Sequence, residues 1–410
     1  MSSQLKIEIA PEIWKFFEML DEDNFQTITN RFEQLKSRNS QYDRSNVNDE
    51  TVGNPVWQIV LECYLAYEQF HAGEPRYAQL FAAEVRRSIP KGSIYFGGTD
   101  PGRGLITALS ESHQDGKPFY TITQNAFANG YYMTYLQQMY GDKISIPQQE
   151  DSKKAFEEYI QDVQKRLQQN QLKPGEDIKI VENRIQVSGQ VSVMQINGLL
   201  AKMFFDRNPE REFFIEESFP LDWMRPHLVP HGFIFKLNRE PLTILPSQII
   251  RSNNRYWRKQ ITPMIGDWIR NDTPVSQVCE FAEKVYVKKN YDGFKGDTRY
   301  VQNEFANKMF SKLRSNFAHL YHWRAKETIV PKEKQQLIKE TNDAYLQSIA
   351  LCPQNSEGLF GFIAFLIEQN QIKEALLVAN LGEKADPANS TIVQLKKSII
   401  EKIGSMGGVK

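Results

Sequence analysis

A glycine-rich turn, Gly97–Gly104, carries the side chains with the clearest capacity for chemistry, and its sequence is GGTDPGRG. A strand is expected before this turn and a helix after it, so backbone N–H groups at a helix N-terminus would face an anion. Asp100 could bind a hydroxyl group or a metal ion, and the guanidinium fork of Arg103 could hold a phosphate or a carboxylate. The predicted ligand-binding residues of the turn are Gly97, Gly98, Thr99, Asp100 and Arg103.

The spacing of these glycines fits neither the dinucleotide-binding pattern G-x-G-x-x-G nor the phosphate-binding P-loop. A purely structural interpretation therefore stands beside the ligand site, namely a tight turn in which Asp100 caps the helix and Arg103 forms a local ion pair. The tendency of α/β sheets to bind ligands at the carboxyl ends of their strands favours the ligand site.

Two amide side chains, Gln124 and Asn125, follow the next expected strand, residues 119–123. Both carry hydrogen-bond donors and acceptors, which suits them to binding a polar ligand. The alternative is that Asn125 caps the helix that follows. If the two strands pair in parallel, both turns open onto the same edge of the sheet and form one site.

Three carboxylates follow a further expected strand, residues 213–216. Glu216, Glu217 and Asp222 lie within seven residues of one another, and Trp223 comes next. The carboxylates could act as a general base or hold a divalent cation, and the indole could stack on a ligand. The alternative is a cluster of helix caps and salt bridges with a buried tryptophan, because acidic side chains often gather at helix starts.

The cysteine and histidine residues give no sign of catalysis or metal binding. Cys63, Cys279 and Cys352 lack the spacing of a metal site or a disulfide framework, and we expect buried, reduced thiols. His227 and His231 are four residues apart, but prolines interrupt any helix between them. The sequence also lacks G-x-S-x-G, so it predicts no catalytic residue, no metal ion and no identifiable cofactor.

Composition and charge narrow the class of protein. The 410 residues contain 50 Lys and Arg against 50 Asp and Glu, so the chain has no net charge and no electrostatic footprint for nucleic acid. No run of about eighteen apolar residues could cross a membrane, and the N-terminus lacks the pattern of a signal peptide. We therefore expect a cytoplasmic, globular protein without a direct membrane span.

Short strands alternate with helices in the middle of the chain, which predicts an α/β fold with a Rossmann-like, mostly parallel sheet. Further strands are expected at residues 143–147 and 233–237, with a hairpin over residues 178–187. The expected domains are an N-terminal helical region with a helical hairpin (1–90), the α/β domain (91–243) and a C-terminal helical domain (244–410).

The C-terminal domain contains an internal repeat. The segment ALCPQNS at residues 350–356 is echoed by KADPANS at residues 384–390, and the prolines of the two segments lie 34 residues apart. That spacing is the period of the tetratricopeptide repeat. Ile363 occupies a position that is usually glycine, so the repeat is degenerate. Because two repeats do not form a stable stack alone, we expect them to pack on the α/β body and to bind a protein partner or a second copy.

Three segments, YFGGTDPGR, TITQNAFAN and SFPLDWM, resemble the soluble region of a family of bacterial membrane proteins of unknown function. That family is related to protein O-mannosyltransferases, and its members often end in tetratricopeptide repeats. The resemblance covers about residues 55–240 and the helical tail, and implies a Rossmann-like extramembrane domain attached to a glycosyl-transfer system. The chain lacks the membrane spans that hold the expected catalytic carboxylate of such transferases. The positions that carry over are Gly97, Gly98, Asp100, Arg103, Gln124 and Asn125.

These features favour a soluble, non-catalytic binding or assembly protein that combines a Rossmann-like ligand pocket with tetratricopeptide-like interaction helices. One alternative is an enzyme of glycosyl-transfer type that uses a nucleotide-sugar or another phosphorylated ligand. In that enzyme Asp100, Glu216, Glu217 or Asp222 would be the base or metal ligand, and Arg103 would hold the phosphate. A second alternative is a structural subunit of a homo-oligomer whose apolar repeat faces stack.

Overall fold

The computed structural model describes residues 2–21, 24–39, 41–42, 49–71, 73–98, 101–109, 118–173, 175–181, 184–216, 222–270 and 272–407. The chain divides into two compact units. The first unit comprises Met1–Ala72, Ala82–His227 and Lys236–Glu240. The second comprises Gly73–Phe81, Leu228–Phe235 and Pro241–Lys410.

The first unit begins with helices that bury an aromatic core. They are α1 (Ser2–Leu5), α2 (Pro11–Met19), α3 (Phe25–Ser37) and α4 (Trp57–His71). Apolar side chains at helical spacing face inward, so that Phe16, Phe32 and Trp57 are buried. The ring of Phe32 stacks on Tyr64 with centroids 3.7 Å apart. This core fixes α4, which also carries polar side chains toward the glycine-rich turn.

The main sheet has five strands in the order β2-β1-β5-β7-β6. Their bounds are β1 Ile94–Phe96, β2 Tyr120–Ile122, β5 Phe213–Ile215, β6 Leu228–His231 and β7 Ile234–Leu237. Strand β1 pairs in parallel with β2 and with β5, and all residues of these three strands are buried. Only Gly232 and Phe233 join β6 to β7, too short a link for a parallel pair. The structure therefore has an α/β arrangement with a mixed sheet, in which the pairs β1–β2 and β1–β5 are parallel.

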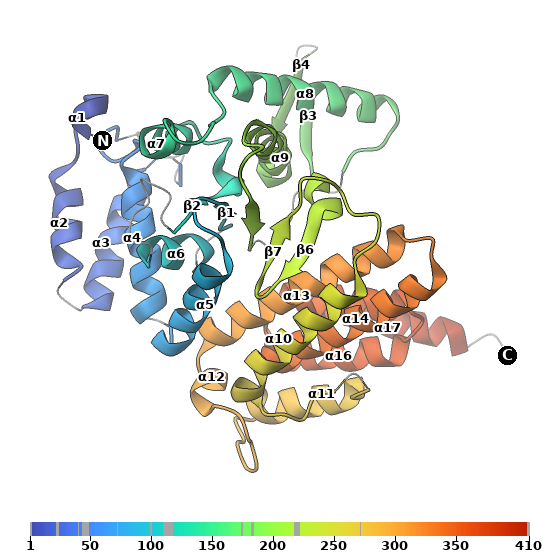
Figure 1. The fold of residues 1–410 in the computed structure, drawn as a ribbon. Helices are drawn as coiled ribbons and strands as arrows, with labels where there is room; N and C mark the ends of the chain where they lie inside the picture. The colour runs from blue at the N-terminus through green and yellow to red at the C-terminus, as the bar shows by residue number, and fades with distance from the viewer. Residues whose placement is uncertain are drawn as a thin grey trace. The chain divides into compact units, whose positions relative to one another are not determined.

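The connecting segments are mainly helical (Figure 1). They are α5 (Pro75–Ser88), a π-helical turn (Pro101–Leu105) that continues into α6 (Ile106–Ala108), α7 (Gly130–Tyr140), α8 (Gln149–Gln168) and α9 (Gly189–Arg207). Asn129 caps α7 by accepting hydrogen bonds from the backbone of Tyr131 and Tyr132. Asp151 accepts from the backbone of Gln148 at 2.7 Å in a capping box that begins α8.

The predicted hairpin over residues 178–187 is confirmed, but it lies in a separate sheet. Strands β3 (Asp177–Val181) and β4 (Arg184–Ser188) pair with each other in antiparallel fashion, and neither belongs to the five-stranded sheet. The strand predicted at residues 143–147 is wrong. Asn208 exchanges two hydrogen bonds with the backbone of Ser145, at 2.8 and 2.9 Å, so a side chain supplies the partners that a neighbouring strand would supply.

Strand β6, for which no strand is expected above, contains Pro230. Proline lacks a backbone donor, which argues against a central strand. The strand order resolves this difficulty, since β6 lies at the edge of the sheet and tolerates one missing donor.

The part of the second unit after residue 246 is an array of helices, which Figure 1 shows in yellow to red. The helices are α10 (Ser247–Ile265), α11 (Val275–Ala282), a π-helical turn (Glu283–Val287), α12 (Thr298–Gln302), α13 (Glu304–Glu327), α14 (Pro331–Leu351), α15 (Ser356–Glu368), α16 (Ile372–Ala385) and α17 (Ser390–Gly407). All of these helices lie within the predicted C-terminal helical domain, residues 244–410. Helices α13 to α17 contact one another in sequence order, as antiparallel helices joined by short turns do.

The internal repeat corresponds to the same local structure used twice. Pro353 and Pro387 each lie in a turn between two helices. Asn355 then accepts from the backbone of Gly358 to cap α15, and Asn389 accepts from the backbone of Ile392 at the start of α17. The repeated sequence thus sets a repeated helix–turn–helix junction.

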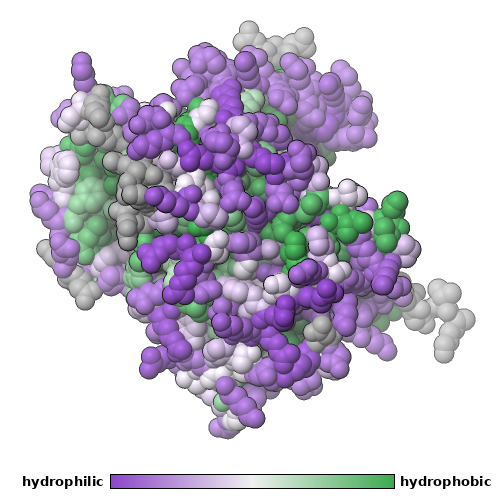
Figure 2. Space-filling model, viewed as in Figure 1, coloured by the Kyte–Doolittle hydropathy of each residue, from purple (hydrophilic) through white to green (hydrophobic). Residues whose placement is uncertain are grey.

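The view in Figure 2 is mainly hydrophilic, with smaller hydrophobic patches. Exposed hydrophobic side chains include Trp14 and Ile180 in the first unit and Ile244, Ile329 and Leu377 in the second. Single exposed apolar residues are common on protein surfaces. Leu377 differs because it also lines a groove among the helices of the second unit.

Candidate functional site

Parallel pairing brings three strand ends to one edge of the sheet in the first unit. The register places Phe96 of β1 opposite both Ile122 of β2 and Ile215 of β5. Beyond the strands the pairing continues, because Gly97 N donates to Ile122 O at 2.8 Å and Glu216 N donates to Phe96 O at 3.0 Å. The residues that follow β1, β2 and β5 therefore lie beside one another.

The glycine-rich turn contacts both neighbouring strand ends. Gly98 adopts a positive φ of 61°, and its N–H donates to Gln124 Oε1 at 3.1 Å. A Cβ on Gly97 would lie 2.6 Å from Gly102 O, and a Cβ on Gly102 would collide with Glu216 Oε2. Only glycine permits this approach, so the turn brings Gly97, Gly98, Gly102, Gln124 and Glu216 together.

Three side chains at the end of β2 present buried polar atoms. Gln124 is fully buried, and Thr121 and Thr123 are each 6% exposed. Within the described part of the chain, Gln124 Nε2 and both threonine hydroxyls have no hydrogen-bond partner. Buried polar groups normally have partners, and leaving one unsatisfied costs about 1–3 kcal/mol. These atoms are therefore unsatisfied donors in the interior at the end of β2.

Sequence reasoning missed the two threonines, although a signal for them exists. Thr121 and Thr123 alternate with Tyr120 and Ile122, so the hydroxyls share one face of the strand. When both faces of a strand are buried, polar side chains on one face require hydrogen-bond partners.

Arg103 occupies a buried ion pair on the other side of the turn. Its Nε donates to Glu62 Oε1 and its Nη2 to Gln58 Oε1, both at 3.0 Å, and both partners belong to α4. Tyr135 donates to Glu62 Oε2 at 2.7 Å, and the ring of Tyr132 lies 5.1 Å from the guanidinium carbon. Burial disfavours the charged guanidinium, but Glu62 raises the pKa of Arg103 above its ordinary value. The structure thus contains the ion pair that was the alternative to phosphate binding.

Asn125 is anchored through its backbone. Asn197 of α9, which is fully buried, donates to Asn125 O and accepts from Ala128 N, both at 2.6 Å. The helix that follows is capped by Asn129, so Asn125 is not its cap. Asn197 escaped sequence reasoning because nothing in the local pattern connects it with a turn 72 residues away.

The remaining predicted residues do not add to this set. Asp222 is largely exposed and forms a surface ion pair with Arg225 at 3.5 Å. Trp223 donates its indole N–H to Gly198 O at 3.0 Å, which ties the short helix Asp222–His227 to α9. Thr99, Asp100 and Glu217 lie outside the described residues.

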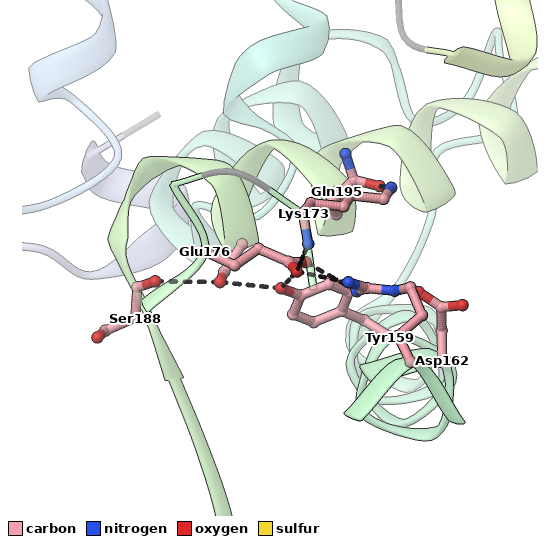
Figure 3. Close-up of polar contacts among 8 residues, drawn as sticks. Tyr159, Asp162, Lys173, Glu176, Ser188 and Gln195 are labelled. Atoms are coloured by element: carbon pink, nitrogen blue, oxygen red, sulfur yellow. Dashed lines mark hydrogen bonds and ion pairs between the residues drawn. The ribbon is translucent and has the colours of Figure 1, made fainter. Parts of the chain in front are cut away.

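A second polar cluster of the first unit surrounds Glu176 (Figure 3). Arg166 of α8 donates to both carboxylate oxygens, at 2.5 and 2.7 Å, and Tyr159 donates to Oε1 at 3.0 Å. The backbone of Lys173 donates to Oε2 at 2.8 Å, and its ammonium donates to Gln195 of α9. Burial favours the neutral acid, but these hydrogen bonds lower the pKa of Glu176 below its ordinary value. Because the carboxylate is fully satisfied, the cluster is a structural clamp that joins α8, α9 and the β3–β4 hairpin.

Burial disfavours the thiolate form of all three cysteines. Cys63, Cys279 and Cys352 are free, and burial raises the pKa of Cys63 to about 11 and that of the other two to about 12. Among the described residues, no group of three or more His, Cys, Asp and Glu side chains is placed to hold a metal ion.

Comparison with known proteins identifies no relative: no protein-family model, no curated protein and no solved structure matches the chain. No helix in the described ranges combines the length and the apolar character needed to cross a membrane.

Proposed function

We propose that the protein is a non-catalytic binding protein, in which the first unit holds a small polar ligand at the strand ends and the second unit holds a partner protein. The observation that supports the ligand site is the set of buried donors at the end of β2, the amide of Gln124 and the hydroxyls of Thr121 and Thr123. Donors of this kind complement the oxygen atoms of a ligand.

The charges around the site favour a neutral, hydroxyl-rich ligand such as a sugar. The carboxylate of Glu216 lies against the turn at Gly102, where it can accept a hydrogen bond from a hydroxyl group and would repel a phosphate. The positive charge of Arg103 is already balanced by Glu62. A sugar-like ligand also agrees with the resemblance to a family connected with glycosyl transfer.

The donors at the end of β2 explain why the proposed function is non-catalytic. Threonine hydroxyls and the glutamine amide bind and orient a ligand but do not ionise near neutral pH, so they are poor general acids and bases. A second candidate function, an enzyme of glycosyl-transfer type, is supported by Glu216, whose buried carboxylate at the same edge could act as a base.

For the second unit, we interpret the repeated helix–turn–helix junctions as tetratricopeptide-like and assign them to partner binding. The small residue at Gly382 supports this interpretation, because a Cβ there would lie 2.6 Å from the side chain of Leu359 on α15. Close packing of paired helices builds the extended surfaces with which helical repeats bind other proteins. We also interpret the α/β part of the chain as Rossmann-like.

A thermal-shift screen of the full chain tests the ligand proposal. The screen compares neutral mono- and disaccharides with nucleotides and sugar phosphates. We expect a neutral sugar to raise the unfolding temperature, since a ligand at about 100 times its Kd adds about 2.7 kcal/mol to the free energy of unfolding. A shift with phosphorylated compounds alone would contradict the proposed ligand class, and no shift with any compound would contradict the site.

Thr123→Val separates binding from folding. Valine keeps the shape of threonine but removes a buried hydroxyl, so we expect the unliganded protein to be equally or more stable and the thermal shift to be lost. Gln138→Ala, at an exposed position of α7, is the matched control and should keep the shift. Unchanged ligand binding by Thr123→Val would remove the hydroxyl from the proposed site.

A further inference from the structure

The second unit contains a groove that sequence reasoning did not identify. It has a volume of about 480 Å³ and is bounded by the start of α11, one face of α14, the end of α15 and the start of α16. This volume falls in the range of pockets that bind ligands, about 300–1,000 Å³. The lining side chains are Asp272, Thr273, Pro274, Val275, Ser276, Ile338, Asn342, Phe365, Gln369, Gln371, Glu374 and Leu377.

Local geometry brings these side chains to a common face. Ile338 and Asn342 are one turn apart on α14, as are Glu374 and Leu377 on α16. The α15–α16 turn is tight, with Asn370 at a φ of 60° and Gln371 N donating to Leu366 O at 2.8 Å. The turn therefore holds the end of α15 and the start of α16 on the same side of the groove.

Apolar side chains form part of the groove wall. Phe365 is 1% exposed and Leu377 is 40% exposed, so the apolar surface continues from the interior to the solvent. Burying the exposed part of Leu377 would be favourable at about 25 cal/mol per Å² of apolar surface. The groove is therefore suited to an apolar side chain of a bound segment.

The polar lining is acidic and rich in amides. The lining includes the carboxylates of Asp272 and Glu374 and no Lys, Arg or His side chain, and neither carboxylate forms an ion pair with a described residue. Asn342, Gln369 and Gln371 each offer a donor and an acceptor, the combination that a peptide bond requires. A cation is attracted by the carboxylates, and a polypeptide backbone is matched by the amides.

We propose that this groove binds a segment of a partner protein in which lysine or arginine alternates with a large apolar residue. Asp272 and Glu374 attract the basic side chain, Leu377 and Phe365 contact the apolar one, and the three amides bind the backbone. The proposal rests on the part of the proposed function that assigns partner binding to the second unit, and it is independent of the ligand at the strand ends.

The test measures fluorescence anisotropy of two labelled peptides with the full chain. One peptide is Leu-Lys-Leu-Lys-Leu-Lys-Leu and the other is Leu-Glu-Leu-Glu-Leu-Glu-Leu. We expect saturable binding of the lysine peptide that weakens when the ionic strength rises from about 0.05 M to about 0.5 M, since exposed charges are screened. The glutamate peptide should bind at least about five-fold more weakly because its carboxylates are repelled.

Two variants locate the binding in the groove. Asp272→Asn combined with Glu374→Gln should weaken binding of the lysine peptide by about five-fold or more and reduce its salt dependence. Leu377→Ser should weaken binding without unfolding the protein, because the side chain is already 40% exposed. Glu401→Gln, an exposed carboxylate of α17 outside the groove, is the matched control and should bind like the unmodified chain.

Each contrary result has a distinct meaning. Equal or tighter binding of the glutamate peptide would overturn the basic partner while leaving partner binding by the second unit intact. Lysine-peptide binding that survives both groove variants would place the site elsewhere and overturn the groove. Binding of neither peptide would overturn both the groove and the assignment of partner binding to these helices, whereas the sugar screen would still decide the site at the strand ends.

Discussion

Asp343→Asn is expected to stabilise the protein at alkaline pH. Asp343 lies on α14 and is 5% exposed, and within the described residues neither carboxylate oxygen has a hydrogen-bond partner. Burial raises the pKa of Asp343 from its ordinary value of 3.8 to about 7, and the charge of Glu340 adds to this effect while Arg314 opposes it. Ionisation of the Asp343 carboxylate therefore destabilises the folded state.

The pKa shift of Asp343 sets how far ionisation of this side chain lowers the free energy of unfolding. The rise from 3.8 to about 7 corresponds to about 4 kcal/mol at 1.36 kcal/mol per pH unit. Between these two pH values the folded state binds more protons than the unfolded state, so this destabilisation grows as the pH rises from about 4 to 7 and is complete above 7. Asparagine does not ionise, but its buried amide still costs about 1–3 kcal/mol. We expect a net gain of about 1–3 kcal/mol near pH 8.5.

Urea denaturation followed by circular dichroism at several pH values between about 4.5 and 8.5 measures this effect. The stability of Asp343→Asn relative to the unmodified chain should rise with pH, and near the acidic end of the range the variant should be no more stable than the unmodified chain. Asp292→Asn, which changes an exposed carboxylate of the same unit, should follow the unmodified chain at every pH. A stability difference that is independent of pH, or a variant that is less stable near pH 8.5, would refute the reasoning.

Three further substitutions test the structural assignments. Arg103→Met leaves the charge of Glu62 buried without its partner, so it should lower the free energy of unfolding by about 3–5 kcal/mol in denaturant titrations. The double variant Arg103→Met with Glu62→Gln should lose less stability, because no unpaired charge remains. Equal losses in the two variants would contradict the ion pair. Glu176→Gln should cost about 1–3 kcal/mol near pH 7. Because the pKa of Glu176 is lowered in the fold, its contribution to stability is present above about pH 4.5 and is lost on acidification. The melting temperatures of the variant and the unmodified chain should therefore converge at low pH. A difference in melting temperature that is the same at every pH would count against the clamp. Gly102→Ala forces a collision with Gly97 O and Glu216 Oε2 and should lower the melting temperature by several degrees. Gly130→Ala is the control, because its added Cβ meets no atom within 4 Å and should leave the melting temperature unchanged. Equal effects of the two substitutions would argue against close approach at the turn.

The elements of this fold could largely be predicted because their signals are local. Helices α13 to α17 follow apolar periodicity and end at turn residues, and the repeated Asn355 and Asn389 form caps with partners three residues away. The ends of β1, β2 and β5 could likewise be placed, since short buried runs stop at glycine or polar residues. Such signals depend only on residues near one another in the chain.

The strand over residues 143–147 and the edge strand β6 show where local signals fail. A β-branched run predicts a strand, but Asn208, 63 residues away, takes the backbone hydrogen bonds of Ser145. Pro230 argues against a strand unless it lies at an edge, and only the strand order shows that it does.

By itself, the sequence determined that a glycine-rich turn follows the first buried strand and that polar residues follow the next two. It left Arg103 compatible with either a phosphate or an ion pair, because both uses require the same residue in the same turn. The tertiary structure decided between them by placing Glu62, 41 residues away, within 3.0 Å of the guanidinium. It also joined Gly98 to Gln124 and buried the hydroxyls of β2, since the partners and burial of a side chain are set by packing between distant segments.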